Sequence, residues 1–205
     1  MYQSRRHTTD GFTLIELLLA MGGIAFLLLF IVFAIVHVTG LYTKGITIRQ
    51  INQVGRQLTD EISRSVRYGG SVTSLPDNNR LCVAGRAYIW NTPAAPNTNK
   101  FASPGNPSVT FVSIDDSKYC EVAHKDDYIP TSARTVVGSL VSVQVFSVTQ
   151  VGAAPLYDVQ AILSTTGANA PTVTTVGGVT TYECSPQFGQ FCAFGEFKTT
   201  VYARD

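Results

Sequence analysis

The four cysteines are the residues whose chemistry is easiest to anticipate: Cys82, Cys120, Cys184 and Cys192. None of them belongs to a C-x-x-C pair of the kind that holds zinc. All follow a long apolar segment, and an even number of cysteines in a domain outside the cytoplasm is typical of disulfides, with three possible pairings. The expected strands favour Cys82–Cys120, and the short separation of the other two favours Cys184–Cys192. We expect two disulfides and no metal site.

The candidates for catalysis are few. His124 lies beside Asp126 and Asp127, where it offers a general base, although a polar turn residue is the simpler interpretation. The acidic pairs, Asp115-Asp116 included, lack the regular ligand spacing of a calcium loop. No nucleophile elbow, zinc-protease or phosphate-loop motif occurs. We therefore expect a protein that is not an enzyme, with no catalytic residue and no cofactor.

One carboxylate, Glu16, lies inside an apolar run over residues 12–36. A helix of that length measures ~37 Å and is long enough to cross a hydrocarbon core of ~30 Å. A charged carboxylate at mid-bilayer costs on the order of 2.5–3.5 kcal/mol, and less near an interface. Arg5 and Arg6 precede the run and favour a cytoplasmic N-terminus. A carboxylate retained at such a cost points to a specific partner.

The residues around Glu16 resemble the prepilin signature of type IV pilins and type II secretion pseudopilins. They read Gly11-Phe12-Thr13-Leu14-Ile15-Glu16-Leu17-Leu18. The resemblance implies that a prepilin peptidase cleaves after Gly11, that the new terminal residue Phe12 is methylated, and that Glu16 is the assembly glutamate. A carboxylate paired with the terminal amine of a neighbouring subunit is tolerated in an apolar medium, where an unpaired one is not.

Two further segments resemble one branch of this family. Residues 58–67 look like the stretch after the membrane in PilW-like minor pilins and J-type pseudopilins, and residues 197–205 are similar to the last strand of those minor pilins. No proline interrupts residues 12–75, whereas major pilins of the common type carry one in this helix. The resemblance thus implies a minor subunit of a type IV pilus, priming or tip-associated. The alternatives are a pseudopilin of a type II secretion or DNA-uptake system, an adhesin-like binding pilin and a major pilin.

The same resemblance implies the partners and the location. The precursor would lie in the bacterial inner membrane with its globular domain outside the cytoplasm, and would then enter an extracellular or periplasmic filament. Its partners would be the prepilin peptidase, an inner-membrane assembly platform and other pilins. The net charge is +1, and the charges after residue 11 balance, so we expect no nucleic-acid partner.

The elements that position these residues follow from periodicity. Apolar residues at Ile48, Ile51, Leu58 and Ile62 share one helical face, and Gly69-Gly70 ends the pattern. We expect one helix over residues 12–68, which spans the membrane with its first half and packs on the domain with its second.

A period of two then predicts strands. They are expected around Leu81–Trp90, Val109–Ile114, Lys118–Val122, Val141–Val145, Tyr157–Leu163 and Phe197–Val201, with a hairpin turn at Gly177-Gly178. The loops 91–108 and 184–192, the latter with Phe188 and Phe191, are candidate binding surfaces. The fold expected is α+β, pilin-like, with a leader at 1–11, a helix at 12–68 and an antiparallel β-domain at 69–205.

Overall fold

The structure is a computed structural model of the whole chain. It describes residues 13–75, 79–95, 98–101, 111–124, 127–176, 179–185 and 191–204. Its contacts divide the chain into two compact units, Met1–Tyr42 and Thr43–Asp205, and each is described by itself. Both share the long helix α1, Leu14–Gly69. The fold class is α+β: one long apolar N-terminal helix and antiparallel sheets in the C-terminal part.

In the first unit, α1 is apolar and uncovered. Every side chain between residues 13 and 39 is exposed. The large apolar side chains from Leu14 to Tyr42 are 51–78% exposed, so none of them is buried by this chain. By length and composition α1 is able to cross a membrane. Its apolar surface needs lipid or other helices around it, because exposed apolar area is costly in water.

The second unit contains a five-stranded sheet in the order β1-β2-β3-β4-β5 with every pair antiparallel. Its strands are β1 Val72–Leu75, β2 Arg80–Val83, β3 Arg86–Trp90, β4 Phe111–Ile114 and β5 Arg134–Val137. Each strand in β2 to β4 is buried almost throughout. The two short 3-10 helices η3, Ser117–Cys120, and η4, Val122–His124, follow β4.

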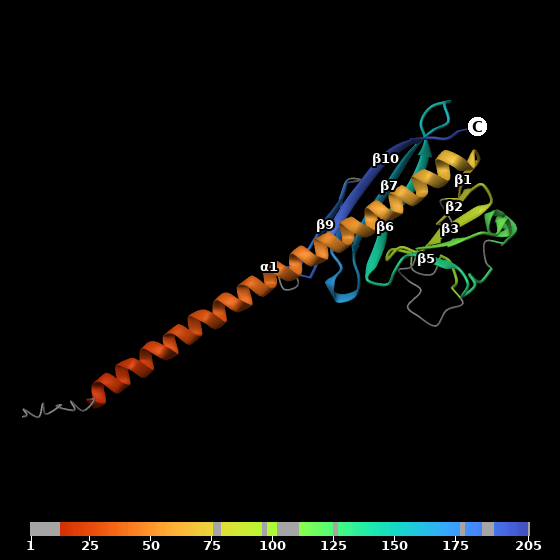
Figure 1. The fold of residues 1–205 in the computed structure, drawn as a ribbon. Coiled ribbons are helices and arrows are strands. Elements are labelled where there is room, and N and C mark those ends of the chain that lie inside the picture. The colour runs from red at the N-terminus through yellow and green to blue at the C-terminus, as the bar shows by residue number, and fades with distance from the viewer. Residues whose placement is uncertain are drawn as a thin grey trace, which may run out of the picture. The chain divides into compact units, whose positions relative to one another are not determined.

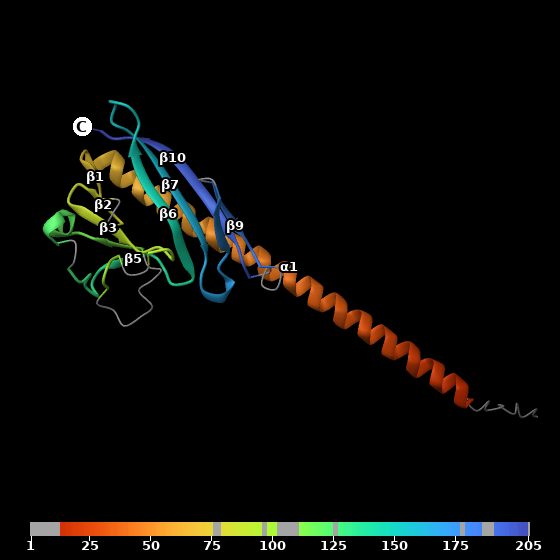
Figure 2. The same ribbon diagram turned by 180° about the vertical axis from the view of Figure 1, so that it is seen from behind.

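A three-stranded antiparallel sheet in the order β10-β7-β6 forms the other main layer. Its strands are longer: β6 Val141–Gln150, β7 Leu156–Thr165 and β10 Phe194–Tyr202. After β7 come the 3-10 helix η5, Gly167–Asn169, and a separate hairpin made of β8, Thr172–Val176, and β9, Val179–Glu183. The Thr43–Gly69 part of α1 lies in front of this sheet in Figure 1, and the sheet lies in front of the helix in Figure 2.

The helix and the sheets enclose the main core. Ile51, Leu58 and Ile62 are at most 2% exposed and join side chains from both sheets, as their shared helical face predicts. Ile48, expected on the same face, is 42% exposed and does not take part. The hydrophobic stripe of α1 therefore begins one turn later than expected.

Aromatic rings join the two sheets. Trp90 of β3 stacks on Phe111 of β4 at 5.4 Å between ring centroids, and Phe146 of β6 meets both rings edge-on at 4.9 and 5.1 Å. The opposite face of the five-stranded sheet buries a smaller apolar cluster that includes Ile89, Val112 and Ile129. Because both faces of β2 to β4 are covered, these strands are apolar at successive positions.

Three expectations about strands need correction. Residues 118–122 are not a strand but lie in η3 and η4, where the Asp116 carboxylate accepts a hydrogen bond from the Lys118 amide and caps η3. The run 81–90 is two strands, joined by a tight turn in which Ala84 and Gly85 have φ values of 50° and 80°. Strands β1 and β5 were not anticipated. The expected turn residues Gly177-Gly178 lie outside the described part of the chain.

Candidate functional site

The N-terminal end of α1 holds the residue singled out for assembly. The Glu16 Oε2 atom accepts hydrogen bonds from the Thr13 amide at 3.1 Å and from Thr13 Oγ1 at 3.0 Å. In return, the Glu16 amide donates to Thr13 Oγ1 at 3.3 Å. This reciprocal pattern is a capping box, in which the first residue before the helix and the third residue within it satisfy each other's amides. Gly11 and Phe12 lie outside the described residues.

The role of Thr13 was not anticipated, although the signal is in the sequence. A Thr followed three positions later by Glu, directly before an apolar run, is the capping-box pattern. The bonds hold the Glu16 carboxylate against the end of its own helix. The arrangement provides a carboxylate that is satisfied within its own chain and lies at the start of an otherwise apolar, exposed segment.

Two disulfides close loops in the second unit: Cys82–Cys120 and Cys184–Cys192. The pairing is the one that strand positions and sequence separation favoured. Cys82 lies in β2 and Cys120 ends η3, so the first link fixes the 3-10 helix to the five-stranded sheet. The second link joins the end of the β8–β9 hairpin to the start of β10.

The contacts of His124 hold neighbouring segments together. Its Nδ1 atom is 3.0 Å from Asp127 Oδ2, and its carbonyl oxygen accepts a hydrogen bond of 3.1 Å from Arg80 Nη1. Arg80 is fully buried and also donates to the Tyr119 carbonyl and to the Asn99 side chain, which fastens η3, η4 and the start of the long loop onto β2. No side-chain hydroxyl or thiol among the described residues hydrogen-bonds to the His124 ring.

The acidic pairs that were weighed against a calcium loop have other contacts. Asp115 pairs with Arg86, and Asp116 caps η3. Within the described ranges, no group of three or more His, Cys, Asp and Glu side chains is arranged to hold a metal ion. Asp126 lies outside those ranges.

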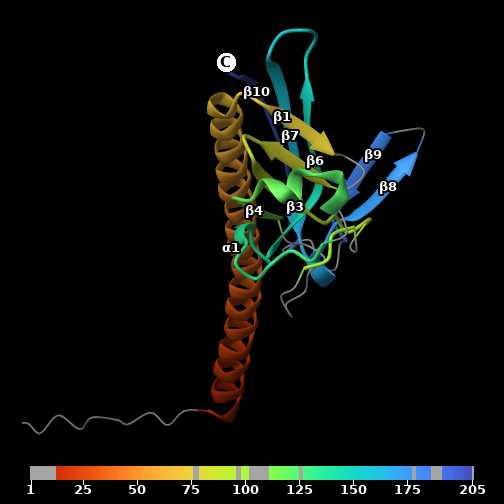
Figure 3. The ribbon, with the colours of Figure 1, turned by 90° about the vertical axis from the view of Figure 1, so that its right-hand side faces the viewer.

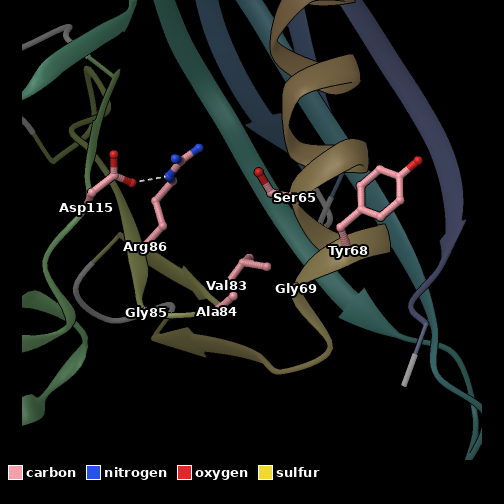
Figure 4. A pocket seen from close by; sticks show the side chains of 8 residues that line it. All are labelled: Ser65, Tyr68, Gly69, Val83, Ala84, Gly85, Arg86 and Asp115. Atoms are coloured by element: carbon pink, nitrogen blue, oxygen red, sulfur yellow. Dashed lines mark hydrogen bonds and ion pairs between the residues drawn. The ribbon is translucent and has the colours of Figure 1, made fainter.

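A cleft of about 350 Å³ lies where α1 ends against the β2–β3 turn. Figure 4 shows the Arg86–Asp115 pair on its sheet side and Ser65 on the helix. The hydrogen bond to Asp115 raises the pKa of Arg86, so this side chain stays charged. The Ser65 hydroxyl lies 2.6 Å from the Tyr88 hydroxyl and is already hydrogen-bonded. The described lining offers fixed polar contacts and no pairing of a nucleophile with a base.

The long loop after β3 is partly described. Asn91 and Asn99 are buried and bond to each other twice: the Asn91 amide group donates to the Asn99 carbonyl at 2.9 Å, and the Asn99 main-chain amide donates to Asn91 Oδ1 at 2.8 Å. These bonds, with one from the Asn99 side chain to the Trp90 carbonyl, fasten Asn99 beside the end of β3. The loop expected at 91–108 therefore begins as an ordered structure.

No protein-family model, no curated protein and no solved structure matches the chain.

Proposed function

We propose that the chain is a pilin-like subunit: a minor, priming or tip-associated subunit of a type IV pilus that polymerises through its N-terminal helix after cleavage behind Gly11. The observation that carries the proposal is Glu16, the single charged residue within the uncovered apolar part of α1 up to Tyr42. On a helix that serves only as an anchor, the carboxylate gives no more than the capping bonds to Thr13. On a helix that must be matched to its neighbours, it also offers a charge for pairing.

The capping box suggests how Glu16 serves in two environments. Before assembly, Thr13 satisfies the carboxylate within the chain, which lowers the cost of holding it in an apolar medium. In a filament, the positive terminal amine of Phe12 from a neighbouring subunit offers a stronger, charge-assisted partner. The exchange of partners would set the register between stacked helices.

The uninterrupted α1 supports a minor rather than a shaft role. The helix runs from Leu14 to Gly69 without a proline, whereas the resemblance associates shaft subunits with a helix-breaking one. Support for an anchored, exported domain comes from the two disulfides, which form and persist outside the reducing cytoplasm.

Processing is the first test. Mass spectrometry of the membrane-extracted protein is expected to find a mature chain that begins at N-methylated Phe12. Gly11→Val is expected to block cleavage, because a small residue is needed before the scissile bond. An intact Met1 terminus in cells with an active prepilin peptidase would refute the proposal.

Substitution of Glu16 tests assembly. Glu16→Leu is expected to be inserted and processed normally but to enter filaments poorly, because the neighbouring amine loses its counter-charge. Glu16→Gln keeps the shape without the charge and should fail nearly as badly, while Glu16→Asp should be intermediate. The readout is immunoblotting of the sheared extracellular fraction together with cysteine crosslinking between sister subunits. Normal incorporation of both Glu16→Leu and Glu16→Gln would leave only a membrane anchor.

A further inference from the structure

The outer face of the three-stranded sheet, away from α1, carries two cross-strand rows of polar side chains. Strand pairing aligns Thr149 of β6, Asp158 of β7 and Thr200 of β10 in one row, and aligns Ser147, Gln160 and Lys198 in the next row. Together the rows line a hollow of about 360 Å³. This is the face turned toward the viewer in Figure 2. We call these six residues the polar grid.

Hydrogen bonds within the sheet hold the grid in place, and they leave several of its donors and acceptors available. Thr200 Oγ1 donates to Asp158 Oδ1 at 2.7 Å, and Gln160 Nε2 donates to Glu196 Oε1 at 2.8 Å. Lys198 Nζ lies 2.7 Å from the same Glu196 oxygen. The second Asp158 oxygen, the Gln160 carbonyl oxygen and two Lys198 N–H groups remain for another partner. Among the described residues, the Ser147 and Thr149 hydroxyls have no hydrogen-bond partner.

Glu196 is the common acceptor of Gln160 and Lys198. The hydrogen bond from Lys198 lowers the pKa of Glu196, so this group stays ionised in mildly acidic solution. Gln160 and Lys198 consequently keep their common acceptor. Groups held in position before binding lose less conformational entropy when a ligand arrives.

Apolar groups border the grid at both ends. Tyr202, two residues beyond Thr200 on the same face of β10, is 58% exposed. At the other end Val145 of β6 is 36% exposed beside Ile162 of β7, its partner in the sheet. Figure 3 shows the β8–β9 hairpin standing out on the side of the sheet away from α1, and Tyr182 of that hairpin packs against Phe194 with ring centroids 5.6 Å apart.

We infer that the polar grid binds a neutral saccharide. Sugar hydroxyls both donate and accept hydrogen bonds, as do the hydroxyl and amide groups that make up most of the grid. Asp158, Lys198 and the Glu196 carboxylate paired with Lys198 leave one net negative charge around the hollow, which disfavours an anionic ligand. The exposed Tyr202 ring offers a flat surface to the C–H face of a sugar ring. The volume falls in the range of small-molecule sites, which begins at about 300 Å³.

An exposed face of an antiparallel sheet is polar in any case, since one face commonly meets solvent. Three features separate this face from an ordinary one: the hollow, the unused hydrogen-bond groups gathered in two adjacent rows, and the bordering aromatic ring. The inference concerns the second unit alone and does not depend on the proposed role in filaments.

The test uses the full chain in nanodiscs, because glycoside detergents would compete for the site. The probe is a printed array of neutral oligosaccharides with sialylated and sulfated ones alongside, followed by calorimetric titration with a neutral oligosaccharide that binds. Binding to neutral oligosaccharides is expected. Asp158→Ala and Gln160→Ala should each weaken it about tenfold or more, since each removes hydrogen bonds made in the hollow.

Matched variants separate the hollow from the rest of the surface. Tyr202→Phe keeps the ring and should bind normally, whereas Tyr202→Ala should bind weakly. Thr73→Ala, on the exposed part of β1 in the other sheet, should have no effect. Circular dichroism checks that every variant is folded. The inference is overturned if no neutral oligosaccharide binds, if folded Asp158→Ala and Gln160→Ala bind as well as the parent, or if only anionic glycans bind and Lys198→Ala abolishes that binding.

Discussion

Thr13 and Glu16 form reciprocal hydrogen bonds at the start of α1, and these bonds contribute a measurable free energy to the helix end. Removing a helix-capping side chain typically costs about 1 kcal/mol. We expect Thr13→Ala to raise amide exchange about fivefold at Glu16 and Leu17, whose amides bond to the Thr13 hydroxyl and carbonyl, with the rest of α1 unchanged. Hydrogen-exchange mass spectrometry of the protein in bicelles measures this effect.

The control for that experiment is Thr13→Ser, which keeps the hydroxyl and should keep the protection. Equal exchange in Thr13→Ala and the parent would show that the box contributes nothing to the helix end. The assay reports on helix fraying, so it is separate from filament assembly.

At the residue scale, the sequence predicts sites that depend on neighbours along the chain and misses those that depend on the fold. The box at Thr13 and Glu16 is local and is readable from a spacing of three. Arg80 is different: it is fully buried, and its partners at Asn99, Tyr119 and His124 come from separate segments. In the sequence, a basic residue before two apolar ones indicates the solvent-exposed end of a strand. The burial of the Arg80 charge becomes visible only when the loops that cover β2 are in place.

At the element scale, a glycine sets how closely α1 approaches the three-stranded sheet. A Cβ atom on Gly55 would lie 2.1 Å from Cε2 of Phe197 on β10. Gly55→Ala must therefore push the helix or the ring aside, and overpacking of this kind costs about 1–3 kcal/mol. We expect a lower melting temperature. Near-ultraviolet circular dichroism of the aromatic cluster around Trp90 measures it.

Gly45 provides the matched control, since a Cβ atom added there meets nothing within 4 Å. Gly45→Ala should leave the melting temperature unchanged or raise it. Alanine favours the helix over glycine by about 1 kcal/mol at most. Adding Phe197→Leu to Gly55→Ala should recover part of the loss, because the ring edge is gone. A Gly55→Ala protein as stable as the parent would mean that the close approach is not maintained.

Periodicity identified the long elements and missed several of the short ones. The helix was expected at residues 12–68 and runs from Leu14 to Gly69, because a sustained apolar pattern has no competing interpretation at that length. Residues 118–122 alternate like a strand, yet the Asp116 cap and the Cys82–Cys120 link turn them into 3-10 helices. β1, with the sequence VTSL, and β5, with RTVV, do not alternate apolar and polar residues, so they show no period of two.

At the scale of the whole molecule, the disulfides differ in the length of chain they close. Cys82–Cys120 spans 38 residues and Cys184–Cys192 spans 8. The chain-entropy relation gives about 3.9 kcal/mol for the first and about 2.5 kcal/mol for the second. We expect the double variant Cys82→Ser/Cys120→Ser to lose more stability than Cys184→Ser/Cys192→Ser in denaturant melts of otherwise identical samples.

Removing both cysteines of a pair avoids a free thiol that would exchange with the remaining link. Peptide mapping without reductant supplies the independent check of connectivity. A Cys120–Cys184 peptide would show that the two links are paired differently in the isolated protein, and the ranking of the variants would then lose its basis.

The fold class could be predicted from the sequence, but the arrangement of its layers could not. An apolar helix followed by alternating segments indicates α+β, but nothing in the alternation of β6, β7 and β10 separates them from the five-stranded sheet. That division depends on Trp90, Phe111 and Phe146, which meet across the two sheets from distant positions in the chain. The polar grid was missed for the same reason, since its rows exist only once three strands are in register.

The contact between Gly55 and Phe197 also imposes an order of events. β10 is the last strand of the chain, so during synthesis the buried stripe of α1 around Ile51, Leu58 and Ile62 waits for nearly the whole domain to emerge. Contacts this distant in sequence form slowly, because a long loop must close before they contribute. Until then the incomplete domain exposes the apolar face of the helix and one unpaired edge of β7, a state prone to aggregation.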